Sequence, residues 1–293
     1  MSPTPTSFPP RQLLEVRPAR EDDRQDISNL IVFESHVHKH LDWKAPMEWL
    51  GYQPFVVLQE GSHLAAALAC PPDPDPVAWL RLFVFNSQLN GAMAWRMLWP
   101  AAVEQLAAQR IPTAAAIAVQ RWLDPILVDN GFDLVNHIVL MELSLGEAVV
   151  PVARDDYRIR EMVPDDLPRV VEVDTAAFEP LWRNSLEALT HALGQASYAS
   201  VAEAETGLVG YQLSTGGAFG THLARIAVRP AMQRRGLGAA LIQDSIAHIP
   251  PGRERRLTLN TQANNAASHA LYARIGFRRT GERFPVFALT IPP

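Results

Sequence analysis

The second half of the chain alternates between short apolar runs and longer stretches with helical spacing of apolar residues. Segments with the length and pattern of strands stand at 198–202, 208–213, 223–228, 256–260 and 284–291. Apolar positions recur with a helical period over 239–249 and 266–275. Strands and helices mixed in this order predict an α/β fold, or an α+β fold with a mixed sheet, built in layers.

The first half repeats this order of elements. Three pairs of similar segments lie at nearly constant spacing: Val16–Asp23 and Ile159–Asp166 (143 residues apart), Leu80–Val84 and Ala224–Val228 (144), Val128–Phe132 and Ala273–Phe277 (145). A fixed offset is typical of a duplicated unit. We therefore predict two tandem domains, 13–146 and 155–293, after a disordered leader, 1–12, that is rich in Ser, Thr and Pro.

Composition excludes several classes of protein. Hydrophobic residues make up 48 % and charged residues 19 % of the 293 residues, which argues against a disordered chain. The single cysteine, Cys70, rules out an intramolecular disulfide and a cysteine-based zinc site. No apolar run approaches the roughly 20 residues that span a bilayer, and the N-terminus lacks a signal-peptide pattern. We expect a cytoplasmic protein that does not bind a membrane.

Charge is distributed unevenly along the chain. The net charge of −5 argues against nucleic acid as a partner. Residues 1–150 hold 10 Lys/Arg and 17 Asp/Glu, whereas residues 151–293 hold 16 and 14. Five of the 16 cations of the second half lie in two tight groups, Arg234–Arg235 and Arg253, Arg255 and Arg256. A local positive cluster in an acidic protein favours a small polyanionic ligand.

The segment that follows Val228 carries the clearest chemical signal. A strand ends there, and Gln233-x-x-Gly236-x-Gly238 opens the next predicted helix. Glycines let backbone N–H groups approach a ligand, and a helix N-terminus presents unpaired N–H groups with partial positive charge. We expect a phosphate site here. Leu241 occupies the third glycine position of a dinucleotide fingerprint, and the chain has no Walker Gly-Lys-Ser/Thr.

This segment resembles the acyl-CoA-binding motif of the GNAT superfamily of N-acetyltransferases, Gln/Arg-x-x-Gly-x-Gly/Ala after a strand. Asn265–Phe277 resembles the second signature of that family, Asn-x-x-Ala/Ser-x-x-Leu-Tyr followed after three residues by Gly-Phe. The resemblance covers Asp155–Ile291 strongly and Leu13–Leu145 weakly. It implies two tandem GNAT (acyl-CoA N-acyltransferase) domains that use acetyl-CoA as co-substrate.

The resemblance also implies roles for individual residues. Val228 N–H would polarise the thioester carbonyl, and Tyr272 would protonate the leaving thiolate as a general acid. The residues implied in cofactor binding are Ile226, Val228, Gln233, Arg234, Arg235, Gly236, Leu237, Gly238, Ala239 and Asn265. The backbone from Gln233 to Ala239 would hold the pyrophosphate, and Ile226 and Val228 would hold the pantetheine arm.

The general base and the acceptor site are less defined. At the position of a carboxylate base in some family members this chain has His222, which can accept a proton at neutral pH; a water relay is the alternative. If the strand is regular, His222, Ala224, Ile226 and Val228 share one face. The resemblance places Phe178, Glu179 and Trp182 in the acceptor groove. In the three-histidine run His36–His40 we expect a solvated helix end or loop and no metal site.

The first half lacks these functional residues. Ala78 stands at the position of His222, Leu127 at that of Tyr272, and one glycine, Gly91, follows Val84. We expect a non-catalytic copy that walls the acceptor site or covers a face of its partner.

The predicted function is an N-acetyltransferase that moves an acetyl group from acetyl-CoA to a primary amine by direct attack in a ternary complex. The alternative is a CoA-binding sensor or interaction module without transferase activity. A small amine, an antibiotic, a peptide N-terminus and a protein lysine all stay open as acceptors. We expect a monomer or a homodimer.

Overall fold

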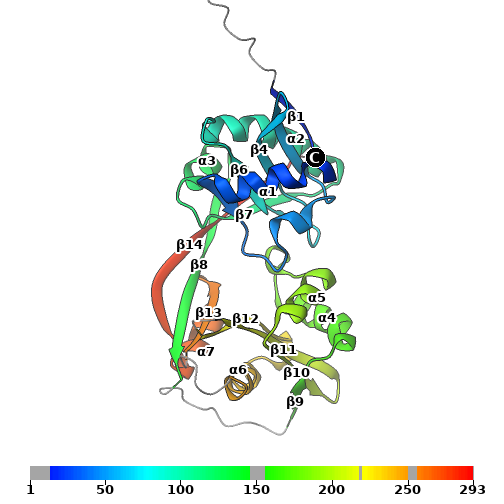
Figure 1. The fold of residues 1–293 in the computed structure, drawn as a ribbon. Coiled ribbons are helices and arrows are strands. Elements are labelled where there is room, and N and C mark those ends of the chain that lie inside the picture. Colours follow the sequence, from blue (N-terminus) through cyan, green and yellow to red (C-terminus); the bar gives the residue numbers. More distant parts are fainter. Residues whose placement is uncertain (1–13, 146–155, 218–219, 250–255, 293) are drawn as a thin grey trace, which may run out of the picture.

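The computed structural model describes residues 14–145, 156–217, 220–249 and 256–292. The predicted leader and the stretch between the two predicted domains lie outside the described residues, as do Arg253 and Arg255. The two halves of the chain form two lobes, one above the other in Figure 1. The mixed α/β class predicted from the sequence is confirmed.

The two halves share most of their order of elements. They differ where the first half has a strand after its first helix and the second half has another helix, and where two short strands of the first half match one strand of the second. The first contains β1 (Leu14–Pro18), α1 (Arg24–Phe33), β2 (His36–Lys39), β3 (Phe55–Glu60), β4 (His63–Ala69), β5 (Val77–Trp79), β6 (Leu82–Phe85), α2 (Gly91–Ala108), β7 (Thr113–Ile117), α3 (Leu123–Asp129) and β8 (Asp133–Ser144). The second contains β9 (Arg158–Glu161), α4 (Leu167–Ala177), α5 (Leu186–Gln195), β10 (Tyr198–Ala204), β11 (Gly207–Gly217), β12 (Gly220–Val228), α6 (Leu237–Ala247), β13 (Arg256–Gln262), α7 (Ala266–Ile275) and β14 (Arg278–Thr290).

An ion pair marks the same place in both halves. Arg17 binds the Asp23 carboxylate through two nitrogens, each at 2.7 Å, and Arg160 binds Asp166 in the same way at 2.7 and 2.8 Å. In both cases the bidentate guanidinium holds the pKa of the carboxyl group below its usual value. Because these pairs are 143 residues apart and join the first strand to the first helix, they support the duplication predicted from the sequence.

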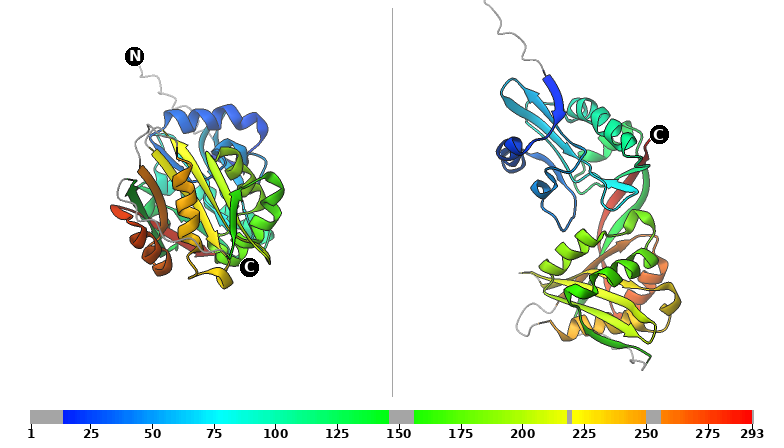
Figure 2. Two further views of the ribbon diagram at one scale, coloured as in Figure 1. Left: turned by 90° about the horizontal axis from the view of Figure 1, so that it is seen from below. Right: turned by 90° about the vertical axis from the view of Figure 1, so that its right-hand side faces the viewer.

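The sheets show how the two halves are joined. One sheet has the strand order β1-β3-β4-β6-β2, and the other has the order β5-β7-β14-β8-β13-β12-β11-β10-β9. Strands β8 and β14 form a long antiparallel ribbon that runs from one lobe to the other (Figures 1 and 2). Residues 138–144 of β8 pair with β13, whereas residues 286–290 of β14 pair with β7. Each half therefore takes a strand segment from the other, and the predicted boundaries between 146 and 155 remain a prediction.

Helices cover both faces of the second-half sheet. Helices α4 and α5 pack their apolar residues against β10 and β11, around Val173, Leu189 and Tyr211. Helices α6 and α7 pack on the opposite face, against β12 and β13, around Ile242 and Tyr272. In the described part of the chain, no helix has the length and apolar character needed to cross a bilayer.

The histidine run in the first half is a strand. The expectation of a solvated helix end or loop is wrong, because His36–Lys39 pairs along its length with β6, from His36 opposite Phe85 to Lys39 opposite Leu82. The His38 side chain is fully buried, and its Nε2 lies 3.0 Å from the Leu80 carbonyl oxygen. The polar composition of His36–Lys39 favours an exposed segment, but pairing with β6 makes it a strand.

Burial of His38 makes the stability of the fold sensitive to acid. Burial lowers the pKa of His38 from 6.5 to about 4. Between these values the unfolded chain binds the proton and the folded chain does not, so stability falls as the pH drops below 6.5. From pH 7 to pH 4.5 this group should cost about 2 kcal/mol of unfolding free energy. Urea titrations of wild type and His38→Gln at both pH values measure this loss.

We expect His38→Gln to reduce the loss by about that amount, because glutamine can still donate to Leu80 and does not titrate. The control His63→Gln removes an exposed histidine and should keep the wild-type loss. An equal loss in wild type and His38→Gln would contradict the assignment.

Candidate active site

Strand β12 has one paired edge and one open edge. It pairs with β11 as far as Val228, but with β13 only from Thr221 to Leu223. The Arg229 N–H donates to the Val209 carbonyl oxygen at 2.8 Å, which fixes the alternation of hydrogen bonds along β12. The N–H groups of Ile226 and Val228 therefore point away from β11, into the gap where β12 and β13 separate. These are the two residues predicted to hold an extended ligand arm.

A bulge at Ala224 interrupts the predicted strand pattern. Leu213 pairs with Arg225 and Ser214 with Leu223, so Ala224 is the extra residue in β12. The expectation that His222, Ala224, Ile226 and Val228 share one face is therefore wrong. The side chain of His222 lies on the face of Arg225, and those of Ile226 and Val228 lie on the other.

The predicted phosphate loop lies at the end of the open edge. Gly236 has φ +87° and Arg234 has φ +61°, and both precede the first residue of α6. The first hydrogen bond of the helix runs from Ala240 N–H to the Gly236 carbonyl oxygen. The N–H groups of residues 237–239 therefore have no acceptor within the helix and face outward from its N-terminus. The Gln233 amide, which donates to the Val228 carbonyl oxygen at 3.0 Å, ties this loop to the strand.

The corresponding edge of the first half is closed. Strand β6 stands at the position of residues 226–229, and β2 pairs with the edge that is open in the second half. At the start of α2 the Asn90 side chain accepts the Ala92 N–H at 2.9 Å. A Cβ on Gly91 would lie 2.8 Å from the Phe85 ring, which leaves little room above the strand. In the first half, therefore, residues of the chain itself hydrogen-bond to the strand edge and to the helix N-terminus. The equivalent backbone groups of the second half have no such partner among the described residues.

A cavity of about 420 Å³ connects the open edge to the first half of the chain. Six residues predicted from the sequence line it: Phe178, Trp182, His222, Ile226, Asn265 and Tyr272. Glu179, predicted beside them, is exposed and is absent from the cavity lining. Val228 and the loop from Gln233 to Ala239 lie beyond the cavity, at the end of the strand. The cavity is closed on the other side by first-half residues, among them Trp79, whose ring centroid lies 5.8 Å from that of Trp182.

The two titratable groups predicted for catalysis are in neutral forms. Burial raises the pKa of Tyr272 to about 12, so its phenol is protonated at neutral pH and hydrogen-bonds with Ser268. Burial lowers the pKa of His222, which is therefore an uncharged imidazole at neutral pH. Its Nδ1 lies 2.9 Å from the Thr258 hydroxyl, which itself donates to the Thr221 carbonyl at 3.4 Å. Nδ1 is therefore the protonated nitrogen, and Nε2 keeps its lone pair.

A buried ion pair, missed in the sequence, fixes the acceptor-side loop. The Arg225 guanidinium binds the fully buried Asp174 carboxylate at 2.6 and 2.9 Å and the Trp182 carbonyl oxygen at 2.6 Å. It also stacks on the Phe178 ring, with Cζ 3.7 Å from the centroid. Arg225 thus holds Phe178 and Trp182, two of the three predicted substrate residues, against β12. The sequence did hold one signal for Arg225: an arginine, Arg81, stands at the equivalent position of the first half, 144 residues earlier.

Comparison with known proteins identifies the fold and the family of the second half. Residues 167–287 match the family described as Acetyltransferase (GNAT) domain. A GCN5-related N-acetyltransferase from Sphaerobacter thermophilus is 19 % identical, covers 98 % of each chain and has a TM-score of 0.62. A tandem GNAT protein from the clavulanic acid biosynthesis pathway is 17 % identical, with 96 % of this chain and 99 % of that chain covered and a TM-score of 0.61.

A GCN5-related N-acetyltransferase from Anabaena variabilis is 12 % identical, with 96 % of this chain and 73 % of that chain covered and a TM-score of 0.69. At these identities the likeness shows the fold alone. No curated protein matches the chain in sequence.

Proposed function

Residues 167–287 belong to the GNAT family of acetyltransferase domains, and we propose that the chain transfers an acetyl group from acetyl-CoA to a primary amine. The observation that carries this proposal is the open edge of β12. It runs from the N-terminus of α6 into a cavity that contains a buried, protonated Tyr272. A diphosphate at the helix, an extended arm along the strand and a thioester in the cavity fit this path.

The first half of the chain supports the proposal that the pantetheine arm binds along the open edge of β12. There, β2 is an extended peptide that hydrogen-bonds to the same edge of the equivalent strand. The pantetheine arm of acetyl-CoA also carries amide groups, and we propose that Ile226 and Val228 bind it as β6 binds β2. The N–H groups of residues 237–239 and the exposed Arg234 and Arg235 then hold the pyrophosphate.

Two side chains, those of His222 and Tyr272, carry the proposed proton transfers. Nε2 of His222, directly or through a water, accepts a proton from the attacking amine. Val228, whose N–H was predicted to polarise the thioester carbonyl, lies beyond the cavity at the diphosphate end of β12, so we assign its N–H to the arm alone. The Tyr272 phenol gives its proton to the sulfur as the C–S bond breaks, so that CoA leaves as the thiol. We propose that the first half, whose corresponding edge is closed, takes no part in catalysis and walls the acceptor site.

Release of free CoA thiol from acetyl-CoA, in the presence and absence of a panel of primary amines, tests the proposed function. We expect amine-dependent release and an acetylated amine of matching mass. Binding of acetyl-CoA without transfer to any amine would instead support a CoA-binding sensor.

The pH dependence of kcat/KM tests the role of His222. Because the base acts in its neutral form and burial lowers its pKa, kcat/KM should fall in acid with a midpoint below pH 6.5. His222→Gln should lower kcat/KM about 100-fold at pH 7 and remove this acid limb. The control His248→Gln changes a histidine outside the cavity and should keep the wild-type profile. An unchanged acid limb in His222→Gln would assign the base to another group.

A further inference from the structure

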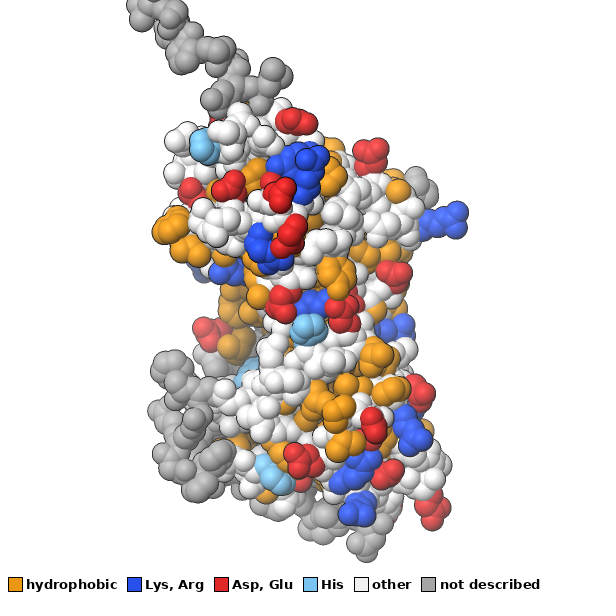
Figure 3. Space-filling view, turned by 45° about the vertical axis from the view of Figure 1, so that its right-hand side comes forward, with side chains coloured by type: hydrophobic (Ala, Val, Ile, Leu, Met, Phe, Trp, Pro, Cys, Tyr) orange, Lys and Arg blue, Asp and Glu red, His pale blue; other side chains and the backbone are white. Residues whose placement is uncertain are grey.

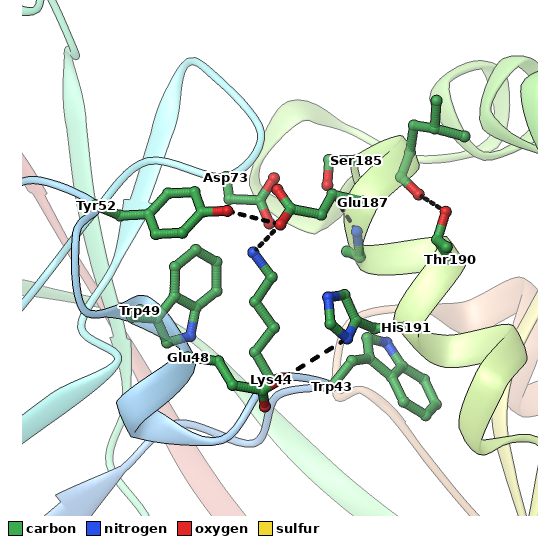
Figure 4. Close-up of polar contacts among 12 residues, drawn as sticks. Trp43, Lys44, Glu48, Trp49, Tyr52, Asp73, Ser185, Glu187, Thr190 and His191 are labelled. Carbon is green, nitrogen blue, oxygen red and sulfur yellow. Dashed lines mark hydrogen bonds and ion pairs between the residues drawn. The ribbon is translucent and has the colours of Figure 1, made fainter.

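A charged cluster lies where the first half borders the cavity, and Figure 4 shows three of its members, Lys44, Asp73 and Glu187. It contains two cations and three carboxylates. Arg81 pairs with Asp42, with Nη1 2.9 Å from Oδ2, and Lys44 pairs with Glu187, with Nζ 2.6 Å from Oε1. Both cations are almost fully buried. The third carboxylate, that of Asp73, lines the cavity and has no cation within ion-pairing distance among the described residues.

Asp73 is the one carboxylate of this cluster that has no ion-pair partner among the described residues. The Ser185 hydroxyl and the charges of Arg81 and Lys44 each act to lower the pKa of this carboxyl group, but neither cation pairs with it. Arg81 bonds to the backbone carbonyl oxygen of Asp73, at 2.9 Å, and not to its carboxylate. Burial raises the pKa of Asp73. A half-buried carboxylate without an ion-pair partner is unfavourable by itself and favourable once a ligand cation reaches it.

Aromatic rings line the same cavity as this carboxylate. Trp43, Trp79 and Trp182 line the same cavity, and the His40 ring stacks on that of Trp79. Ring faces attract cations, with larger effect where water is excluded. The fold already uses this device a short distance away, where Lys44 Nζ lies 4.1 Å from the centroid of Trp49. The waist between the two lobes also carries acidic, basic and histidine side chains on the face shown in Figure 3.

We propose that Asp73, a residue of the first half, binds a second positively charged group of the acceptor. The acceptor is then a diamine or a larger polycationic amine: one amine reacts at the thioester, and the other ammonium group binds the Asp73 carboxylate in a cavity that indole rings also line. This inference rests on the proposed function. It also gives the first half a specific task, because that half supplies the recognition group and the second half supplies the chemistry.

The test compares matched acceptors on the full chain. Diaminoalkanes of three to eight carbons and the monoamines of the same length are assayed by CoA release. We expect kcat/KM for the diamines to exceed that for the monoamines by about 10- to 100-fold at the length that spans the cavity. Asp73→Asn should remove this difference and leave kcat/KM for the monoamines near wild type. The matched control Asp75→Asn changes an exposed carboxylate of the same loop and should keep the preference.

Two results would overturn the inference. Diamines that react no better than monoamines at every length would do so in the wild-type protein alone, without any variant. A preference that survives Asp73→Asn would assign recognition to another group. Failure of the proposed function looks different, since no amine of either kind would then release CoA. In that case calorimetric titration with 1,6-diaminohexane and with hexylamine decides whether Asp73 binds the second ammonium group.

Discussion

Tyr272→Phe is expected to lower kcat by about 10² to 10³ with little change in the affinity for acetyl-CoA. The phenol is buried in the cavity and protonated at neutral pH, with its pKa raised to about 12 by burial. Removing the hydroxyl removes the proton that the thiolate needs as it leaves, and it keeps the ring that packs in the core of this half. Steady-state kinetics and calorimetric binding of acetyl-CoA separate the two effects.

The matched control is Tyr198→Phe. The Tyr198 hydroxyl donates to Asp244 at 2.9 Å, outside the cavity, so its removal should leave kcat near the wild-type value. Equal kcat values for wild type and Tyr272→Phe would remove Tyr272 from the mechanism. A matching loss in Tyr198→Phe would trace the effect to stability.

Gly236→Asp should weaken acetyl-CoA binding by at least about 100-fold. The new carboxylate would stand at the N-terminus of α6, where the diphosphate is proposed to bind, and would repel it. A side chain at Gly236 meets no atom within 4 Å, so the substitution strains only the local backbone at φ +87°. Isothermal titration calorimetry with acetyl-CoA measures the change.

Gly281→Asp provides the control for backbone strain. Gly281 also has a positive φ, +93°, and open space around its Cβ position. It lies in β14, which β8 and β13 separate from β12. Gly281→Asp should therefore bind acetyl-CoA as the wild type does. Wild-type affinity in Gly236→Asp would refute the phosphate site itself.

Much of the local structure was predictable from the sequence. The predicted helix 266–275 has the observed bounds, because its N-cap Asn265 and its C-terminal Gly276 are both strong local signals. The helix predicted at 239–249 begins two residues earlier, at Leu237, directly after Gly236. The repeat offset matches β1 with β9, α1 with α4 and α2 with α6, since it depends on segments in the chain, but it does not reveal β2 or the division between β5 and β6.

Features set by tertiary pairing were not predictable. The exchange of β8 and β14 depends on which sheet edges meet, and an apolar pattern does not specify an edge. The same reason explains β2, whose polar sequence does not reveal that it closes an edge of β6. The bulge at Ala224 has no glycine or proline to mark it. Asp73 enters the candidate site from a first-half loop, which no motif of the second half could indicate.

The number of acetyl-CoA molecules bound per chain is the most direct test of this division of labour. The second half offers an open strand edge below a helix N-terminus, and in the first half β2 and Asn90 occupy the equivalent groups. Calorimetric titration of the full chain should therefore give one site per chain, and Gly236→Asp should abolish it. Two sites per chain, or one site that persists in Gly236→Asp, would contradict the claim that only the second half binds acetyl-CoA.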